Sequence, residues 1–532
     1  MADLLHELPL RSAERRPEAP ALTLLDRTIA YGDLASLIRR VARGLLDLRI
    51  GRGERVAFYL DKRFETVATA FGAACAGAAF VPINPLLKGD QVGHILRDCN
   101  VRVVVTNAER LDGIADTLAA CPDLRHVVVV GPTDGVTIAG RTLVSWDAFV
   151  AHDGGAAHRV IDTDLTAILY TSGSTGRPKG VMLSHRNMVA GAKSVASYLA
   201  NHDADVILSA LPLSFDAGFS QLTTAFHVGA RVVLLNYLLP RDVLDALARE
   251  RVTGLTAVPP LWIQLSQLAW PDTIASHLRY IANTGGRMPR ETLARLRAQL
   301  PHTKPYLMYG LTEAFRSTYL PPSEVDRRPD SIGKAIPNAE ILVLRDDGSP
   351  CEPDEPGELV HRGALVSMGY WNDREKTAER FKPLPAGVAG RETGMILPEI
   401  AVFSGDSVRM DAEGFLYFIG RTDEMIKTSG YRVSPTEIEE VIYSTGLVGE
   451  AAAFGVAHTV LGQAIVVIAT PPAGGALDSA ALTAQCRARL PAYMVPAHVE
   501  VHAGPLPRNP NGKIDRKLLA QTYAEQRAGA VA

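Results

Sequence analysis

The alternation of short apolar runs with helical patterns constrains the fold of this chain more than any other feature. The apolar runs include Val101–Val105, Val127–Val130, Val232–Leu235 and Ile341–Leu344, and intervening segments such as Asp242–Glu250 carry the spacing of a helix. Runs that are apolar at nearly every position are typical of strands buried on both faces. Strands that alternate with helices indicate a layered α/β architecture.

A chain of 532 residues is too long for one compact core, so at least two domains are expected. A new helix begins late in the chain, where Ser434 can serve as N-cap, Pro435 as the first helical residue and Glu437 as capping-box partner. We therefore predict a large N-terminal domain of layered α/β subdomains over 1–421 and a small α/β domain over 422–532. The tail, Glu525–Ala532, is expected to fray.

Composition and charge exclude several classes of protein. The formal net charge of -3 argues against a nucleic-acid-binding protein, because such proteins are usually basic. The five cysteines are scattered without a C-x-x-C pair, which predicts neither a zinc site nor a disulfide framework. No leader peptide is recognisable, and the longest apolar stretch, Val67–Val81, is shorter than a membrane span of ~20 residues. We expect a cytoplasmic protein without a membrane partner, and a buried helix running into a strand over Val67–Val81.

The segment Tyr170–Gly180, with the sequence YTSGSTGRPKG, has the composition of a phosphate-binding loop and follows an apolar strand at Leu165–Leu169. Glycines let the backbone approach a ligand, hydroxyls donate hydrogen bonds and a lysine supplies a cation, although the Walker A spacing is absent. The alternative is a flexible Ser/Gly linker, but linkers rarely carry Pro-Lys-Gly directly after a strand. The residues assigned to the polyphosphate are Thr171, Ser172, Gly173, Ser174, Thr175, Gly176 and Lys179.

This segment resembles the signature of the adenylate-forming superfamily, which includes acyl-CoA synthetases, luciferases and nonribosomal peptide adenylation domains. Further segments match that family in order along the chain: Tyr309–Ala314, Pro356–Leu359, Gly369–Trp371, Ser404–Ser407, Gly420–Glu424, Ile426–Gly430, Leu490–Pro496 and Asn511–Arg516. Each segment is a weak signal alone, but their order and spacing are specific. The resemblance implies a ligase that uses ATP and Mg²⁺ to make an acyl-AMP and then passes the acyl group to a thiol.

The same resemblance assigns roles around ATP. Thr312 and Glu313 are expected at the α-phosphate, with Glu313 as the Mg²⁺ ligand, since Mg²⁺ favours one carboxylate together with phosphate oxygens. Asp406 is expected to accept hydrogen bonds from the ribose hydroxyls, Arg421 to make a further ribose or phosphate contact, and Tyr309 to flank adenine. The alternatives are a solvated turn for Glu313, a structural turn for Asp406 and a core position for Tyr309.

The resemblance also implies a domain movement. Lys513 matches the lysine that reaches from the small domain to the carboxylate and the α-phosphate, a role suited to a mobile point charge. Asp423 matches the hinge at which the small domain rotates between an adenylating and a thioester-forming pose. The segment Lys427–Tyr431 would then swing in, with Gly430 leaving room for a pantetheine thiol.

The acid site carries the main departure from fatty acyl-CoA synthetases, which usually have a histidine-containing pattern here. This chain has Phe215-Asp216 instead, which resembles amino-acid adenylation domains in which the aspartate binds the substrate ammonium. A buried carboxylate needs a counter-ion, and a substrate cation supplies one. The alternative is that Asp216 pairs with Arg316 or caps a helix.

The acid pocket carried over from amino-acid adenylation domains has a mostly small or apolar lining, which suits a modest substrate side chain. Arg316 is its one basic member, and it either binds a substrate carboxylate or is structural. The pocket residues are Asp216, Ala217, Ser220, Leu261, Ala282, Thr284, Gly285, Met308, Arg316 and Ser317.

The sequence around the pocket resembles free-standing ligases that load proline or β-amino acids onto carrier proteins, and also a bacterial acyl-CoA ligase-like group. We expect the acceptor to be a separate acyl or peptidyl carrier protein in specialised metabolite biosynthesis, with CoA as the alternative acceptor. Two other functions stay open: an AMP-forming acyl-CoA ligase for a non-amino acid, and a degenerate homologue that binds nucleotide without turnover. Retention of Lys513, Glu313 and Lys179 argues against the degenerate homologue.

Overall fold

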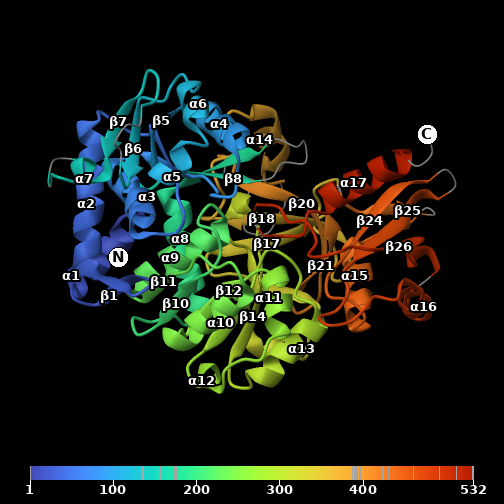
Figure 1. Ribbon diagram of the computed structural model, residues 1–532. Helices are drawn as coiled ribbons and strands as arrows, with labels where there is room; N and C mark the ends of the chain where they lie inside the picture. Colours follow the sequence, from blue (N-terminus) through green and yellow to red (C-terminus); the bar gives the residue numbers. More distant parts are fainter. Residues whose placement is uncertain are drawn as a thin grey trace.

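The computed structural model describes residues 2–132, 137–152, 154, 157–171, 178–385, 388, 394, 397–421, 424–428, 431–458, 461–490, 492–510 and 512–529. It is a mixed α/β protein with a large N-terminal part and a smaller C-terminal part, which confirms the predicted fold class. Figure 1 shows the C-terminal elements gathered on one side of the N-terminal body. Among the described helices, none combines the length and apolar character that crossing a bilayer requires.

Among the described residues, the first sheet has seven strands in the order β7-β6-β5-β3-β4-β8-β9, parallel except for the last pair. Its strands are β3 (Arg55–Tyr59), β4 (Ala79–Pro82), β5 (Val101–Asn107), β6 (His126–Val130), β7 (Thr142–Ser145), β8 (Leu165–Thr171) and β9 (Lys179–Ser184). The helices connected to it are α2 (Tyr31–Asp47), α3 (Phe64–Ala76), α4 (Gly89–Asp98), α5 (Ala108–Leu111), α6 (Ala115–Ala119) and α7 (Trp146–Phe149).

The second sheet has fourteen strands in the part of the chain that the structure describes, and one half of it is parallel. That half contains β1 (Pro20–Leu24), β10 (Val206–Ser209), β11 (Arg231–Leu234), β12 (Gly254–Ala257), β13 (Tyr280–Asn283) and β14 (Lys304–Tyr309), with β2 (Arg27–Ala30) antiparallel at the edge. Its helices are α1 (Glu7–Arg15), α8 (His185–Tyr198), α9 (Asp216–Val228), α10 (Pro240–Arg249), α11 (Pro259–Ser266), α12 (Asp272–Ala275) and α13 (Arg290–Gln299).

Alternating side chains on the strands build five layers. Val103 and Val105 of β5 join a core shared with α2, α3, α8 and α9, whereas Val101 and Val104 join the core on the opposite face, under α4 and α6. In the second sheet, Val232 and Leu234 of β11 face the shared core, whereas Val233 lies in the core under α10, α11 and α13. The order is therefore helices, sheet, helices, sheet, helices, which explains why these strands are apolar on both faces.

The other half of the second sheet is antiparallel and runs on from β14. It contains β15 (Thr318–Leu320), β16 (Ser331–Ala335), β17 (Ala339–Leu344), β18 (Gly357–Gly363), β19 (Phe381–Pro383), β20 (Ile400–Met410) and β21 (Leu416–Arg421), with α14 (Arg374–Arg380) beside it.

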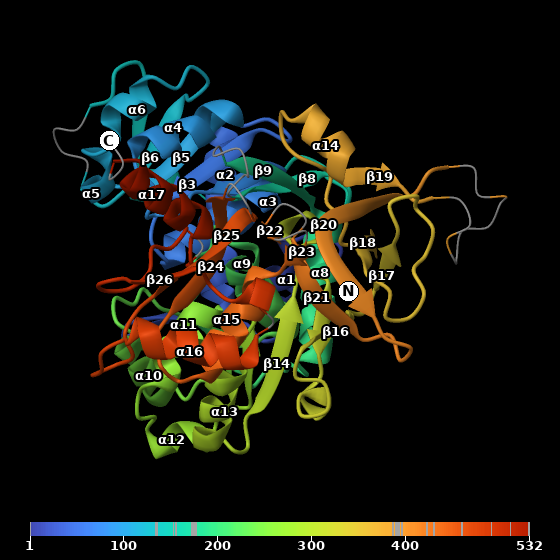
Figure 2. The ribbon, with the colours of Figure 1, turned by 90° about the vertical axis from the view of Figure 1, so that its right-hand side faces the viewer.

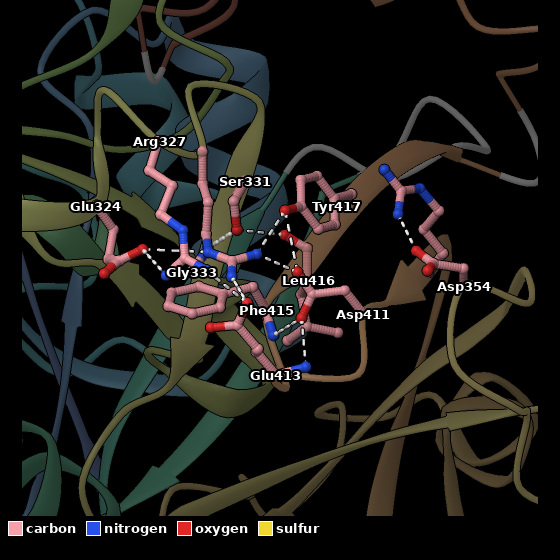
Figure 3. A network of polar contacts seen from close by, with 12 residues as sticks. Glu324, Arg327, Ser331, Gly333, Asp354, Asp411, Glu413, Phe415, Leu416 and Tyr417 are labelled. Atoms are coloured by element: carbon pink, nitrogen blue, oxygen red, sulfur yellow. Dashed lines mark hydrogen bonds and ion pairs between the residues drawn. The ribbon is translucent and has the colours of Figure 1, made fainter.

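A polar network fastens the turn between β20 and β21 to the segment before β16 (Figure 3). Arg328 Nε donates to Glu324 at 3.1 Å, and the guanidinium also pairs with Asp411 and Glu413. The Arg328 guanidinium carbon lies 4.0 Å from the centroid of the Phe415 ring. These contacts hold β20 and β21, the two strands that carry Asp406 and Arg421, in a fixed position.

The described residues of the C-terminal part form a separate five-stranded sheet. Its strands are β22 (Ile426–Thr428), β23 (Tyr431–Val433), β24 (Ala451–His458), β25 (Gly462–Ala469) and β26 (His498–Val501), and its helices are α15 (Pro435–Ser444), α16 (Ser479–Arg489) and α17 (Arg516–Gly529). Residues of β24 alternate between a core under α15 and α16 and a core under α17.

The predicted strands and helices agree with the structure except at the ends of two helices. Val67–Val81 forms α3 followed by β4, and Asp242–Glu250 corresponds to α10. The capping box predicted before α15 is wrong: Ser434 is the N-cap, but its hydroxyl lies 2.8 Å from the Thr436 hydroxyl and caps no backbone N–H. The tail predicted to fray is helical to Gly529, because α17 packs Leu519 and Tyr523 onto the sheet. The boundary between 421 and 422 stays a prediction.

Candidate active site

The predicted phosphate loop connects two antiparallel strands. Thr171 ends β8, Lys179 begins β9, and the two residues are paired in register. Ser172, Gly173, Ser174, Thr175 and Gly176 lie outside the described residues. The base of the hairpin is held by Tyr170, whose hydroxyl donates to Asp98 Oδ2 at 2.5 Å.

Lys179 and Glu313 lie on either side of Tyr370. The Lys179 ammonium is 5.7 Å from the centroid of the Tyr370 ring, and the Tyr370 hydroxyl donates to Glu313 Oε1 at 2.5 Å. A backbone bridge between Tyr370 and Val181 of β9 fixes the tyrosine. Burial lowers the pKa of Lys179 from that of an ordinary lysine. The sequence singled out Tyr370 only as part of a motif, so its contact with Glu313 was missed.

Asp406 and Arg421 face each other across β20 and β21 and pair in register. Arg421 Nε lies 3.3 Å from Asp406 Oδ1, and the Tyr309 hydroxyl donates to Asp406 Oδ2. Burial raises the pKa of Asp406, an effect that the charge of Arg421 opposes. The structure thus brings together the three residues that were assigned to adenine and ribose.

The predicted acid pocket lies at the carboxyl ends of adjacent parallel strands, where ligands commonly bind in open α/β sheets. Ala282 and Thr284 come from the end of β13, Met308 from β14, and Asp216 begins α9, which follows β10. The Met308 sulfur accepts a hydrogen bond from Tyr198 at 3.0 Å. Further members of the predicted lining are buried in the surrounding cores: Ala217, Ser220, Leu261 and Ser317.

Asp216 is buried and has three partners from the protein. Its Oδ1 accepts from the Ala217 backbone N–H at 2.6 Å, and its Oδ2 lies 3.4 Å from the Thr312 hydroxyl and 3.8 Å from Arg316 Nη1. Its place in the first turn of α9 also favours a negative charge. The pairing with Arg316, which the sequence left open, is therefore present, and so is a helix-terminal hydrogen bond.

Two neighbours fix Arg316. Phe315 has a φ of 55°, which is rare for a bulky residue, and its ring packs so closely on Gly191 that a Cβ there would lie 2.5 Å from it. Ser317 is held on the other side by the buried His361, whose Nδ1 is 3.0 Å from the Ser317 hydroxyl. Burial lowers the pKa of His361 to about 3, so this imidazole is neutral. No motif in the sequence pointed to this histidine.

Lys513 reaches from the C-terminal part into the acid pocket. Its ammonium lies 5.7 Å from the centroid of the Phe215 ring, and a Cβ on Gly285 would come within 2.9 Å of Lys513 Cε. Burial lowers the pKa of Lys513, while the charge of Asp216 raises it. Gly285, predicted to line the substrate, therefore lies against Lys513.

Contacts between the two parts hold this arrangement, and they include contacts of α13 with α15. Figure 2 shows the C-terminal elements lying in front of the N-terminal part. Glu440 of α15 accepts from the Arg290 backbone N–H at 3.1 Å and lies 3.6 Å from Arg287 Nε. The Asn84 side chain donates to the Pro510 carbonyl at 2.5 Å. The predicted hinge residue Asp423 and Gly430 lie outside the described residues.

Comparison with known proteins decides the family. The "AMP-binding enzyme" profile matches residues 10–371, and the "AMP-binding enzyme C-terminal domain" profile matches residues 437–513. The chain belongs to the AMP-binding enzyme family. It is therefore an adenylate-forming ligase, and the resemblance drawn from the motifs is confirmed.

The relatives of this AMP-binding enzyme differ in acid and acceptor. Indoleacetate--CoA ligase from Aromatoleum aromaticum is 30% identical over 97% of this chain and 98% of its own length. L-proline--[L-prolyl-carrier protein] ligase from Pseudomonas fluorescens is 29% identical over 97% of this chain and 99% of its own. A plipastatin synthase polypeptide from Bacillus subtilis is 30% identical over 96% of this chain, which spans only 13% of that much longer protein.

Solved structures have the same fold over nearly the whole chain. An anthranilate CoA ligase in complex with anthranoyl-AMP superposes with a TM-score of 0.86 at 24% identity, covering 98% of this chain and 97% of that one. O-succinylbenzoate Coenzyme A Synthetase from Bacillus subtilis, in complex with ATP and a magnesium ion, has a TM-score of 0.79 at 25% identity, covering 96% and 98%. This AMP-binding enzyme uses ATP and Mg²⁺.

The described residues fit these two ligands. Asp406 Oδ1 is buried and forms the ion pair with Arg421 but no hydrogen bond among the described residues, so it can still accept one from a ribose hydroxyl. The described residues contain no cluster of three His, Cys, Asp or Glu side chains that would enclose a metal by itself. A single carboxylate such as Glu313 suits Mg²⁺ whose other ligands are phosphate oxygens and water. The individual roles of these residues remain predictions.

Proposed function

We propose that this enzyme activates an amino acid as an aminoacyl-AMP and transfers it to the phosphopantetheine thiol of a separate carrier protein. The observation that carries the proposal is the burial of Asp216, a carboxylate with 3% exposure that follows Phe215, the residue whose ring Lys513 approaches. A buried carboxylate in a binding pocket favours a substrate that brings a cation, as an ammonium group does.

The pocket supports adenylation by neutralising charge. The substrate carboxylate oxygen attacks the α-phosphorus of ATP, and the bond to pyrophosphate breaks. Both reactants are anions, so the Lys513 ammonium is suited to hold them together, and Glu313 is suited to hold Mg²⁺ at the phosphates. In the second step the carrier thiol attacks the acyl carbon and AMP leaves.

The relative named for loading proline onto a carrier protein supports the choice of acceptor, because the match covers both chains almost completely. The relative named for joining indoleacetate to CoA matches equally well and keeps CoA as the alternative. The Asp216–Arg316 pair favours this second candidate, an acyl-CoA ligase for an acid without an amine, because Arg316 already gives Asp216 a counter-ion.

The test is pyrophosphate exchange with matched pairs of acids that differ only in the amine. We expect the amine-bearing acid to be preferred in the parent enzyme. Asp216→Asn should lower its kcat/KM by ~10²-fold or more and leave the deaminated acid nearly unchanged. Preference for a deaminated acid would contradict the amino-acid assignment and favour the second candidate.

Mass spectrometry then decides the acceptor. The parent enzyme is incubated with ATP, its best acid and either a holo-carrier protein or CoA. Loading of the carrier at a rate well above that of acyl-CoA formation is expected, and efficient acyl-CoA formation without carrier loading contradicts this assignment.

A further inference from the structure

The guanidinium of Arg316 is buried beside the acid pocket with hydrogen-bond donors to spare. Its side chain is 4% exposed. Nη1 donates to the Phe315 carbonyl at 3.2 Å, but Nε has no acceptor among the described residues. An arginine carries five N–H groups, and a buried donor without an acceptor is costly in free energy.

Asp216 does not satisfy this arginine. The separation of 3.8 Å between Arg316 Nη1 and Asp216 Oδ2 allows electrostatic attraction but is too long for a hydrogen bond. Asp216 is already occupied by the Ala217 N–H and the Thr312 hydroxyl. A paired arginine in a purely structural role normally makes short, bidentate contacts, as Arg279 does with Asp205 at 2.8 and 2.6 Å.

The charges around the pocket also favour a substrate that carries a second carboxylate. Lys513 is assigned to the reacting carboxylate and to ATP, so its charge is compensated with any acid. Asp216 and Arg316 then remain as two opposite charges. A substrate ammonium balances Asp216 and leaves Arg316, whereas a second substrate carboxylate balances Arg316. A plain monocarboxylate brings no acceptor for Arg316 beyond the carboxylate that reacts.

We propose that Arg316 binds a second carboxylate of the substrate, so that the substrate class is an amino acid with an acidic side chain. This inference rests on the proposed function. The ammonium pairs with Asp216, the distant carboxylate pairs with Arg316, and the reacting carboxylate lies toward Lys513. Arg316 is then a specificity-determining residue held in place by Phe315 and Ser317.

The experiment is pyrophosphate exchange with two matched sets: aspartate, asparagine, succinate and alanine, and glutamate, glutamine, glutarate and norvaline. We expect the acidic amino acid of one set to exceed its amide by at least ~10²-fold in kcat/KM, because a guanidinium without its carboxylate stays unpaired. Arg316→Gln should lower kcat/KM for the acidic amino acid by ~10²-fold or more and kcat/KM for the amide by less than ~10-fold.

Two additional measurements separate recognition from folding. Arg316→Lys keeps the buried charge but lacks the planar fork, so it should fold and still lose at least ~10-fold of the preference for the acid over its amide. The thermal midpoint of the parent enzyme should rise more with the acidic amino acid than with its amide.

The outcomes are distinguishable. Equal kcat/KM for the acidic amino acid and its amide in the parent enzyme overturns the role of Arg316. An equal loss of kcat/KM for every substrate in both Arg316 variants does the same. Either result leaves the amino-acid proposal standing. Exchange with succinate or glutarate but with no amine-bearing acid overturns the proposed function and keeps the role of Arg316. Exchange with none of the eight acids contradicts the acidic amino-acid assignment.

Discussion

Lys513 and Gly285 are in direct contact, although they belong to different parts of the molecule. A Cβ on residue 285 would lie 2.9 Å from Lys513 Cε and 3.2 Å from a methyl group of Val258. Gly285 also has a φ of +76°, in the region that L side chains rarely adopt. The absence of a side chain here leaves the space through which the lysine enters the pocket.

Gly285→Ala should therefore block adenylation selectively. The methyl group displaces Lys513, so acyl-AMP formation should fall by ~10-fold or more, while transfer from preformed acyl-AMP to the thiol should change little. The two half-reactions are measured by pyrophosphate exchange and by thioester formation from synthetic acyl-AMP. Gly286→Ala is the matched control, since its Cβ would meet Pro259 at 3.1 Å and no part of Lys513. Equal losses in the two variants would contradict the contact argument.

Lys513→Ala should lower kcat for acyl-AMP formation by at least ~10²-fold. Transfer from preformed acyl-AMP should stay nearly unchanged. Lys304→Ala, an exposed lysine at the start of β14, is the control. Burial lowers the pKa of Lys513, so its ammonium loses a proton at a lower pH than an ordinary lysine does. Adenylation should therefore decline as pH rises through that lowered pKa. The decline should move to higher pH in Lys513→Arg, provided that this variant is active.

Tyr370→Phe should impair Mg²⁺ use without removing any ligand. Loss of the hydroxyl frees the Glu313 carboxylate to reorient, and such supporting contacts are worth about 10–100-fold in metal affinity or activity. We expect a higher Mg²⁺ concentration for half-maximal exchange and a partial recovery of rate at saturating Mg²⁺. Tyr443→Phe, which loses a partly buried hydrogen bond to the Ala451 carbonyl, controls for stability. An unchanged Mg²⁺ dependence would show that the Tyr370 contact has no functional role.

Glu440→Gln should weaken the pose in which Lys513 enters the pocket. The carboxylate accepts from the Arg290 N–H and attracts Arg287, and both contacts join α15 to the N-terminal body. We expect adenylation to fall a few-fold and transfer to stay constant or rise. Glu437→Gln, on an exposed position of the same helix, is the control. Parallel loss of both half-reactions would argue against a pose-specific contact.

Much of the fold was predictable because it follows from local patterns. Apolar runs such as Val101–Val105 mark strands buried on both faces, and β5 has this character because cores lie on either side of it. The motif residues were found because their spacing is preserved along the chain. Asp406 and Arg421 then come together as a registered pair on neighbouring strands.

The remaining features depend on contacts between distant segments. Tyr370 meets Glu313 through a bridge to β9, and His361 meets Ser317 across strands that are not adjacent in sequence. The helix end after Glu525 was mispredicted because its stability comes from packing of Leu519 and Tyr523. The Ser434 hydroxyl turns to Thr436, a local competitor that a capping-box pattern does not reveal.

Stability measurements on Asp216 and Arg316 provide the last prediction. Asp216→Asn leaves the buried guanidinium without a counter-ion, so we expect a loss of about 3 kcal/mol in the free energy of unfolding. If the substrate were the only counter-ion of Asp216, its replacement by Asn would not destabilise the ligand-free enzyme. Arg316→Gln should cost a similar amount of unfolding free energy, because it leaves the buried Asp216 carboxylate without the positive charge of Arg316.

The double variant Asp216→Asn/Arg316→Gln should be less destabilised than the sum of the two single variants, because neither charge remains. The double-mutant cycle, measured by denaturant unfolding of the ligand-free enzyme, gives the coupling energy of the pair directly. Addition of the acidic amino acid provides the second readout. Ligand should stabilise the parent most, each single variant less and the double variant least, since each group holds one charge of the substrate. A coupling energy near zero would mean that the 3.8 Å separation carries no pairing, and Arg316 would then depend on the substrate alone for its counter-ion.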